Sequence, residues 1–331
     1  MFIRYRIKNT EPCGFTIESW DIMHSTNLLD STPGAYIVSL RGEFVYKGNK
    51  HPLKFYTELE YIQITSQLSI SFSLHNPNRA LHKGGLWDLG DPGSEHFDAY
   101  NMKIDFADNN PLRYKAEPEQ EWILIKDNIS IVQHASGGKK WQSQVHVEAD
   151  NQVHLKQNGY SVNHHGEVIR GKRATPELQC THGLGLMVEK FWQNFPASLS
   201  LDQNQCCIGL FPQNDRPYEL QGGEKKTKTI WLSLSGQHSE LSWVQNPPVA
   251  RPSLQWLSKH MMLPIFLESG ADDPLQQLIQ KGIDGENNFF TKREAIDEYG
   301  WRHFGELYAD HETARYEGND DFVSHFNNQY D

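Results

Sequence analysis

The sequence predicts a mainly β protein: a large antiparallel β-sandwich with a smaller β-unit before it and the start of a helical domain after it. Three observations support this fold class. Short runs of alternating apolar and polar residues extend from Phe2 to about Leu241, with turn residues between them. A proline-rich linker then interrupts the alternation between Pro247 and Pro252. After the linker, apolar residues recur at helical spacing.

The strand prediction comes from β-branched and aromatic residues that recur at every second position. The clearest runs are residues 35–40, 42–46, 68–74, 129–132 and 229–234. A period of two places successive side chains on opposite faces of a sheet, so each run can bury one face. We assign residues 1–66 to the smaller β-unit and residues 67–246 to the sandwich.

Residues 253–331 are predicted to begin a helical domain. A proline follows a capping residue at Asp273-Pro274, and apolar residues recur behind it at Leu275, Leu278, Ile279 and Ile283. The segment from Arg293 to Tyr308 is rich in helix formers, although Gly300 and Gly305 predict kinks or short pieces.

Composition narrows the classes of partner. The chain has 31 lysines and arginines against 42 aspartates and glutamates, a net charge of −11. Such a charge repels nucleic acid and anionic membranes, so we expect neither as a partner. An acidic polysaccharide stays compatible, because a few converging cations in a pocket override distant screened charges.

The cysteines and the first residues bear on location. Cys13, Cys180, Cys206 and Cys207 lack CxxC spacing, and two of them are adjacent. Met1 to Lys8 contains no apolar signal-like region. The sequence as written predicts a cytoplasmic protein with reduced thiols, and an extracellular or periplasmic one if an upstream signal has been lost.

Several common catalytic motifs are missing from the sequence. It contains no Walker A, GxSxG, HExxH or EF-hand pattern. These absences remove the commonest nucleotide-binding, serine-hydrolase and zinc-protease interpretations.

The strongest compositional bias lies in the tail. Residues 284–331 contain ten aromatic residues and three histidines. Aromatic planes mixed with imidazole, guanidinium and amide groups suit a carbohydrate site. If the tail is locally helical, Tyr299 and Arg302 share a face, which places a phenol beside a guanidinium. The alternative is a packed helix with Tyr299, Trp301 and Phe304 in the core.

Two further clusters have a functional and a structural interpretation. The loop from Asn76 to Ser94 can present Arg79, His82, Lys83, Asp88 and Asp91 to one cleft, or it can be a structural loop in which aspartates cap turns. His325, with Asn327 and Tyr330, can be a base beside a sugar-binding amide, or the capped start of a helix after Ser324.

Three stretches together resemble one family: residues 76–94, residues 190–196 with 220–227, and residues 293–312 followed by 324–331. They are similar to the exo-rhamnogalacturonan lyase family, also called the YetA-like family. The resemblance implies a polysaccharide lyase with a β-barrel, a central β-sandwich and a C-terminal α/α toroid. It also implies that residues 1–66 are a partial barrel-like unit, that residues 253–331 begin the toroid, and that a second chain is a candidate to complete it.

The resemblance further implies β-elimination at a galacturonate residue of rhamnogalacturonan. A base removes the proton at C5, the oxygen at C4 leaves, and cations or a metal neutralise the substrate carboxylate. The expected base is Tyr299 or His325, the expected acid is His82 or His311, and Arg302 is the expected carboxylate clamp. The metal is left open, with a divalent cation such as calcium as a candidate. Further substrate-binding residues are expected at Arg79, Lys83, Lys292, Arg293, Trp301, Asn327 and Tyr330.

Three alternatives stay open from the sequence alone. A glycoside hydrolase would use two carboxylates among Asp297, Glu298, Asp310 and Glu312. A β-sandwich that only binds pectic sugar would need no catalytic residue. An inactive fragment without a ligand is the third alternative.

Overall fold

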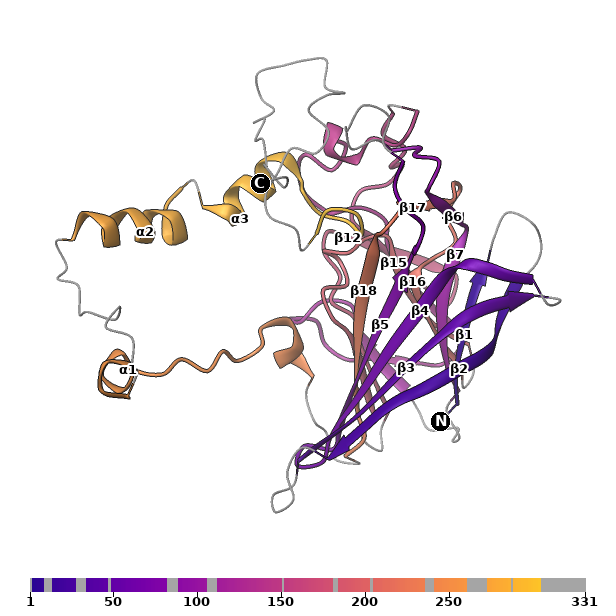
Figure 1. Cartoon of the computed structure of the whole chain (residues 1–331), viewed down its shortest axis with the longest axis horizontal. Helices are drawn as coiled ribbons and strands as arrows, with labels where there is room; N and C mark the ends of the chain where they lie inside the picture. Colours follow the sequence, from indigo (N-terminus) through magenta and orange to yellow (C-terminus); the bar gives the residue numbers. More distant parts are fainter. Residues whose placement is uncertain are drawn as a thin grey trace.

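A computed structural model describes most of the chain, and its fold is mainly β (Figure 1). The described residues are 2–8, 14–27, 34–46, 49–81, 89–105, 112–150, 152–180, 184–202, 205–235, 241–260, 273–286 and 288–304. The strands are β1 (Phe2–Lys8), β2 (Gly14–Asn27), β3 (Ala35–Tyr46), β4 (Asn49–Ile62), β5 (Gln67–His75), β6 (Glu95–Phe97), β7 (Ala99–Asp105), β8 (Leu112–Lys115), β9 (Ile123–Ile125), β10 (Ile129–Gln133), β11 (Tyr160–His164), β12 (Glu167–Gly171), β13 (Glu177–Cys180), β14 (Gly185–Val188), β15 (Ala197–Asp202), β16 (Gln205–Phe211), β17 (Tyr218–Leu220) and β18 (Lys225–Ser233).

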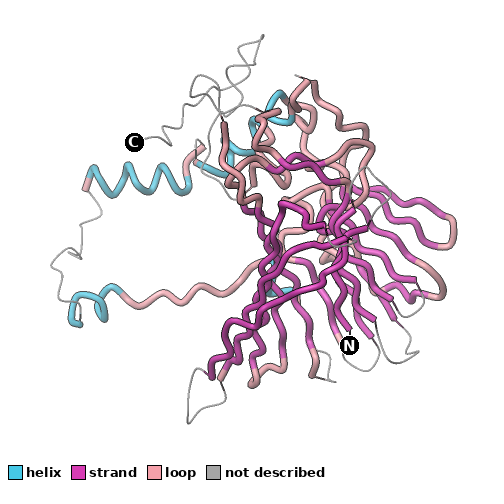
Figure 2. The backbone as a smooth tube through the Cα atoms, turned by 45° about the vertical axis from the view of Figure 1, so that its right-hand side comes forward, coloured by secondary structure: helices cyan, strands magenta, loops and turns pink. Residues whose placement is uncertain are grey.

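The described strands pair antiparallel throughout. One sheet has the order β12-β11-β10-β15-β16-β7-β1-β2-β3-β4-β5-β18-β14-β13-β8-β9, and β17 pairs separately with β6. Figure 2 shows the strands spreading from the end of the molecule where most of the loops gather. The prediction of a mainly β chain built from large antiparallel sheets is confirmed.

The two halves of the long sheet face each other across one apolar core. In the order given above, the first half runs from β12 to β2 and the second half from β3 to β9. The ring of Tyr100, in β7 of the first half, meets the rings of Phe72 in β5 and Phe44 in β3, each with centroids 5.8 Å apart. Within the second half, Ile70 of β5 pairs with Ile230 of β18, and both are fully buried. The alternation read from the sequence therefore points apolar side chains into this core.

The strands of residues 1–66 belong to the same sheet and form no barrel of their own. β4 pairs with β5 along nine positions, from Lys54–His75 to Ile62–Gln67. Phe44 and Phe55 are buried in the same core cluster as Phe72. This corrects the expected barrel-like unit. β4 pairs with the edge of β5 and β3 pairs with β4, so these strands continue the apolar face of the sandwich sheet.

Three α-helices and two 3₁₀-helices are described. They are α1 (Leu254–His260), α2 (Pro274–Asp284), α3 (Phe289–Ile296), η1 (Gln144–His146) and η2 (Ser242–Gln245). The predicted cap of α2 is confirmed, because the Asp273 side chain accepts a hydrogen bond of 2.9 Å from the backbone N–H of Leu275. In Figure 1, α1 and α2 stand away from the sheets. The α/α toroid stays a prediction.

The segment from Arg293 to Tyr308 is helical only at its start, in line with the kinks or short pieces that its glycines predict. α3 ends at Ile296, because Asp297 adopts the left-handed conformation with φ of 61°. Residues 301–304 form turns instead.

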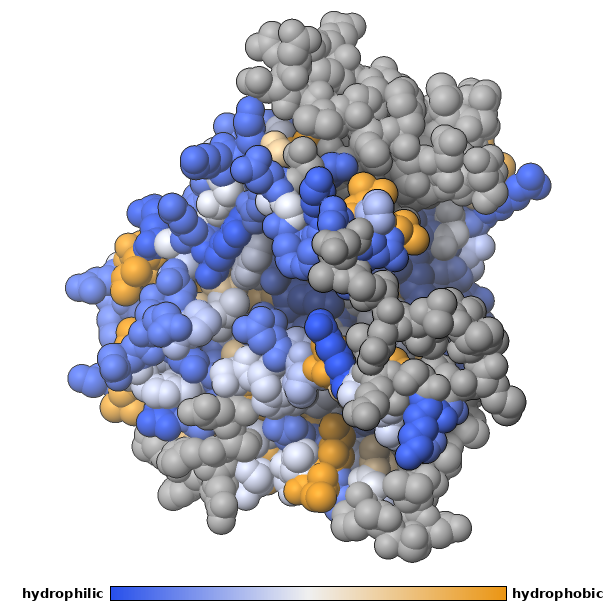
Figure 3. Space-filling model, turned by 90° about the vertical axis from the view of Figure 1, so that its left-hand side faces the viewer, coloured by the Kyte–Doolittle hydropathy of each residue, from blue (hydrophilic) through white to orange (hydrophobic). Residues whose placement is uncertain are grey.

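The outer surface matches the acidic, polar composition. The face drawn in Figure 3 is largely hydrophilic, with hydrophobic side chains in small separate patches. No helix among the described residues is long and apolar enough to cross a membrane.

Two isoleucines on strands that flank β11 test the burial pattern. Ile131 of β10 is fully buried, whereas Ile169 of β12 is 48% exposed. We expect Ile131→Ala to lower the free energy of unfolding by about 2–5 kcal/mol, through lost transfer energy and a cavity. Ile169→Ala should change it by less than about 0.5 kcal/mol. Urea denaturation measures both, and equal effects would contradict the core described above.

Candidate functional site

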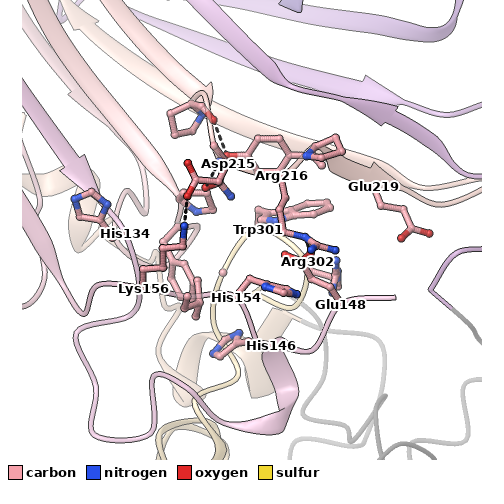
Figure 4. A pocket seen from close by; sticks show the side chains of 18 of the residues that line it. His134, His146, Glu148, His154, Lys156, Asp215, Arg216, Glu219, Trp301 and Arg302 are labelled. Carbon is pink, nitrogen blue, oxygen red and sulfur yellow. Dashed lines mark hydrogen bonds and ion pairs between the residues drawn. The ribbon is translucent and has the colours of Figure 1, made fainter. Parts of the chain in front are cut away.

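A pocket of about 790 Å³ lies where loops of the sandwich meet the tail. Its walls come from the long loop after β10, the turn before β15, the segment from Pro212 to Glu219, and residues 299–303. Figure 4 shows Arg216, Arg302, His154, His146 and Trp301 around this space.

The tail docks onto the turn before β15 through its backbone. Gly300 donates a hydrogen bond to the carbonyl of Gln193 (2.7 Å), and Trp301 donates one to the carbonyl of Phe195 (2.8 Å). Gly300 has φ of 94°, and a Cβ there would lie 3.2 Å from the Phe195 ring, so this close approach favours glycine. The Trp301 ring then packs edge-on against Phe211, with centroids 5.4 Å apart.

The same tail segment grips the loop that carries η1. The hydroxyl of Ser143 donates to the carbonyl of Ile296 (2.5 Å). His303 Nε2 lies 2.8 Å from the Val145 carbonyl, which can only accept, so this nitrogen is the donor. Arg302 Nη1 donates to the carbonyl of Val147 (2.8 Å).

His146 lies between Val145 and Val147 in the sequence, and its side chain has a buried partner, Asp297. Its Nε2 is 3.0 Å from Oδ1 of Asp297, a carboxylate that is 1% exposed. The hydroxyl of Ser136 donates to the other oxygen, Oδ2, at 2.5 Å. The backbone N–H of Gly138 donates to the Ser136 hydroxyl (3.0 Å). A chain of hydrogen bonds therefore runs from the backbone to the His146 ring.

Ion pairs line the part of the pocket formed by the Pro212–Glu219 segment and residues 148–156. Arg216 contacts Glu148 through Nε (2.6 Å) and Asp150 through Nη2 (3.1 Å). His154 Nε2 lies 2.7 Å from Asp150 Oδ2. Lys156 forms an ion pair with Asp215, and its hydrogen bond lowers the pKa of that carboxyl group.

Arg302 keeps hydrogen-bonding capacity toward the pocket. A guanidinium has five donors, and the contact of Arg302 with Val147 is the single side-chain hydrogen bond it makes among the described residues. Its Cζ lies 5.3 Å from the centroid of the Trp301 ring. Its backbone is fixed as well, because Lys226 Nζ donates to its carbonyl (2.7 Å).

Tyr299 lines the pocket, but its phenol is not beside Arg302 as the helical interpretation required. The phenol donates to Glu294 Oε1 (2.7 Å), and Arg173 Nη2 contacts both oxygens of Glu294 at 2.8 Å. Burial, followed by the hydrogen bond to Glu294, raises the pKa of Tyr299 well above its ordinary value. The deprotonated phenol that a base would need is therefore disfavoured at neutral pH.

The other predicted site residues fall into three groups. Trp301 and Arg302 line the pocket. Arg79, Lys292 and Arg293 are described but do not line it; Arg79 is exposed, and Arg293 Nε lies 3.9 Å from Glu298 Oε2. His82, Lys83, Asp88, Asp310, His311, Glu312, His325, Asn327 and Tyr330 lie outside the described residues.

The structural interpretation holds for the described part of the loop from Asn76 to Ser94. Asp91 accepts hydrogen bonds from the backbone of Leu81 (3.0 and 2.9 Å) and Gly93 (2.8 Å). The Asn76 amide donates to the carbonyls of Gly93 (2.8 Å) and Leu220 (2.9 Å). These contacts fold the loop onto the sandwich.

Sequence reasoning missed the histidines and charges supplied by the loop after β10 and by the segment before β17. The missed pocket residues include His134, His146, Glu148, His154, Lys156, Asp215 and Arg216. The signal available was the density of histidines and carboxylates between His146 and His154, a stretch without a recognisable motif. Among the described residues, no group of three or more His, Cys, Asp or Glu side chains could hold a metal ion.

Comparisons with known proteins give only distant similarities. No protein family model and no curated protein matches the sequence. The galactosidase domain of an α-galactosidase–sucrose kinase is similar with a TM-score of 0.36 and 13% identity, over 70% of this chain and 30% of that one. A galactose mutarotase-like protein from Clostridium acetobutylicum gives 0.31 and 10%, over 70% of this chain and 77% of that one.

A TPR-domain containing protein from Parabacteroides distasonis gives a TM-score of 0.38 and 11% identity, over 76% of this chain and 40% of that one. The chain thus spans less than a third of the galactosidase structure and less than half of the TPR-domain structure. Scores and identities of this size carry no argument about activity, so the function is argued below from the pocket.

A buried lysine supports one wall of the pocket. Lys228 of β18 donates through Nζ to the carbonyls of Asn194 (3.0 Å) and Leu210, next to Phe195 and Phe211. Burial lowers the pKa of Lys228 to about 7. The turn before β15 is therefore tied to the sheet by a side chain that is costly to charge.

Lys228 predicts a pH dependence of stability. Between its folded pKa of about 7 and the ordinary 10.5, the unfolded state binds more protons, so stability rises with pH across this window. Lys228→Met should flatten that rise, whereas Lys139→Met, at an exposed position, should leave it intact. Urea denaturation at a series of pH values measures the slopes, and an unchanged slope in Lys228→Met would contradict the assignment.

Proposed function

We propose that the pocket binds a galacturonate residue of a rhamnogalacturonan-type polysaccharide, and that the protein is a polysaccharide lyase-like protein acting by β-elimination. One observation carries the proposal: Arg302, with unused guanidinium donors, lies beside the ring of Trp301 in a pocket of about 790 Å³. That volume is in the range of small-ligand sites.

A uronate ligand matches these two side chains. A guanidinium binds a carboxylate through two parallel hydrogen bonds. An aromatic face beside it suits the apolar face of a sugar ring. Arg216 and Lys156 add positive charge to the walls, although each is paired with a carboxylate.

β-Elimination needs little more than this chemistry plus proton transfer. Clamping the carboxylate stabilises the negative charge that develops when the proton on the adjacent carbon leaves. In galacturonate, H5 and the axial O4 lie on opposite faces, so acid and base must be different groups. His146 and His154 both line the pocket and are candidates for proton transfer.

The carboxylates of the pocket favour a lyase over a hydrolase. A hydrolase needs a carboxylic acid that can give its proton to the leaving oxygen, yet Glu148 and Asp215 are ion-paired with Arg216 and Lys156. Glu219 accepts hydrogen bonds from the backbone of Gly90 (2.6 Å) and the hydroxyl of Ser94 (2.8 Å). Asp297 and Glu298 are buried and do not line the pocket.

Replacing Arg302 tests the proposal. With rhamnogalacturonan as substrate, we expect the protein to generate the ultraviolet absorbance of an unsaturated uronide, and Arg302→Ala to abolish it. Calorimetry with a galacturonate-containing oligosaccharide should show a loss of about 1.5–3 kcal/mol of binding free energy in Arg302→Ala, as expected for hydrogen bonds to a charged group.

Arg251→Ala is the matched control, because Arg251 is an exposed arginine of the linker that does not line the pocket. It should leave both measurements unchanged. Binding without an unsaturated product would indicate a non-catalytic carbohydrate-binding protein. If the folded protein neither binds the oligosaccharide nor forms the unsaturated product, the proposal is overturned.

A further inference from the structure

His146 has the contacts of an oriented proton acceptor. Its imidazole lines the pocket, and its Nε2 is held 3.0 Å from Oδ1 of Asp297. A carboxylate accepts, so Nε2 carries the ring proton of the neutral imidazole and Nδ1 carries the lone pair. Among the described residues, Nδ1 makes no hydrogen bond.

The surroundings of Asp297 are shaped around its carboxylate. A Cβ on Gly138 would lie 2.6 Å from Asp297 Oδ2 and 3.2 Å from the Ser136 hydroxyl, so a side chain there would displace the carboxylate. Ser136 and His146 each bind one carboxylate oxygen. Asp297 itself is a non-glycine residue in the left-handed region, with φ of 61°. Such backbone conformations cluster at functional sites.

The base and the clamp are held by the same short segment. Arg302 Nη1 binds the carbonyl of Val147, the residue that follows His146. The proton removed in β-elimination sits on the carbon that bears the clamped carboxylate. The guanidinium of Arg302 is therefore bonded to the residue next to His146, and both side chains line the pocket. A base for this reaction has to be held close to the clamped carboxylate.

Two other pocket histidines, His154 and His134, are held less firmly for this role. His154 Nε2 contacts Asp150, whose side chain is 38% exposed. His134 Nε2 contacts the hydroxyl of Ser161 in place of a carboxylate (2.8 Å). A buried carboxylate orients an imidazole and stabilises its protonated form better than an exposed carboxylate or a hydroxyl does.

We infer that His146 is the catalytic base that removes the C5 proton, and that Asp297 and Ser136 are positioning residues that hold its ring. This inference rests on the proposed function. The Nδ1 lone pair takes the proton, the C5–H electron pair forms the C4=C5 double bond, and the C4–O4 bond breaks. The departing oxygen takes a proton from water, and the imidazolium returns its proton to water.

The test compares His146→Gln with His165→Gln in the rhamnogalacturonan assay. His165 also pairs with an aspartate, Asp127 (3.1 Å), but on the surface and outside the pocket. We expect His146→Gln to lower kcat roughly 10²- to 10⁴-fold while oligosaccharide binding stays within about threefold, as expected of a group used in the proton transfer rather than in binding. His165→Gln should leave both unchanged.

Chemical rescue separates a base from a structural residue. Added imidazole should restore part of the rate of His146→Ala and none of the rate of Arg302→Ala. Asp297→Asn should lower kcat with little change in KM, because the ring loses its orientation while the clamp remains.

The outcomes distinguish this inference from the proposed function. An active wild type with a fully active His146→Gln, or a His146→Ala variant without any rescue by imidazole, overturns the assignment of the base and leaves the lyase proposal standing. A folded wild type that produces no unsaturated uronide overturns both. Circular dichroism and thermal unfolding of each variant confirm that the comparison is made on folded protein.

Discussion

The docking of residues 296–303 onto the loop that carries η1 is the constraint on which the rest of the site depends. Ser143, Val145, His146 and Val147 are each held by a partner from this tail segment. The tail is fixed in turn by the backbone bonds of Gly300 and Trp301. Without these contacts, neither Arg302 nor His146 would have a defined position relative to the other.

The buried carboxylate of Asp297 explains why this docking is specific. An ionised group removed from water is costly unless its oxygens are satisfied. Asp297 is 1% exposed, and Ser136 and His146 each supply a hydrogen bond to it. Other arrangements of the tail would leave the charge unpaired, so polar satisfaction selects this one. The Trp301 ring, packed against Phe211 and Tyr218, adds apolar burial to the same arrangement.

The sandwich contributes a rigid base for loops that have little regular structure. The core between Tyr100 and Phe72 fixes the strands, and the pocket is formed mainly by the segments between them. Lys228 links the packed sheet to the pocket wall, because its side chain extends from β18 and donates to the carbonyls of Asn194 and Leu210. Functional groups on loops become precise when the loops are tied to a packed scaffold in this way.

The β-rich fold and the capped start of α2 could be predicted from the sequence alone, and the same analysis singled out Tyr299, Trp301 and Arg302, which line the pocket. Period-two patterns and capping residues act over a few positions, so they are readable locally. The end of α3 at Asp297 could not be predicted in this way, because Ser136 and His146, far away in the chain, bind the Asp297 side chain at the left-handed turn. Only the tertiary structure decided that Asp297 meets His146, a contact across 151 positions. No local pattern encodes such a pairing, since it arises from the cost of burying a charge without a partner.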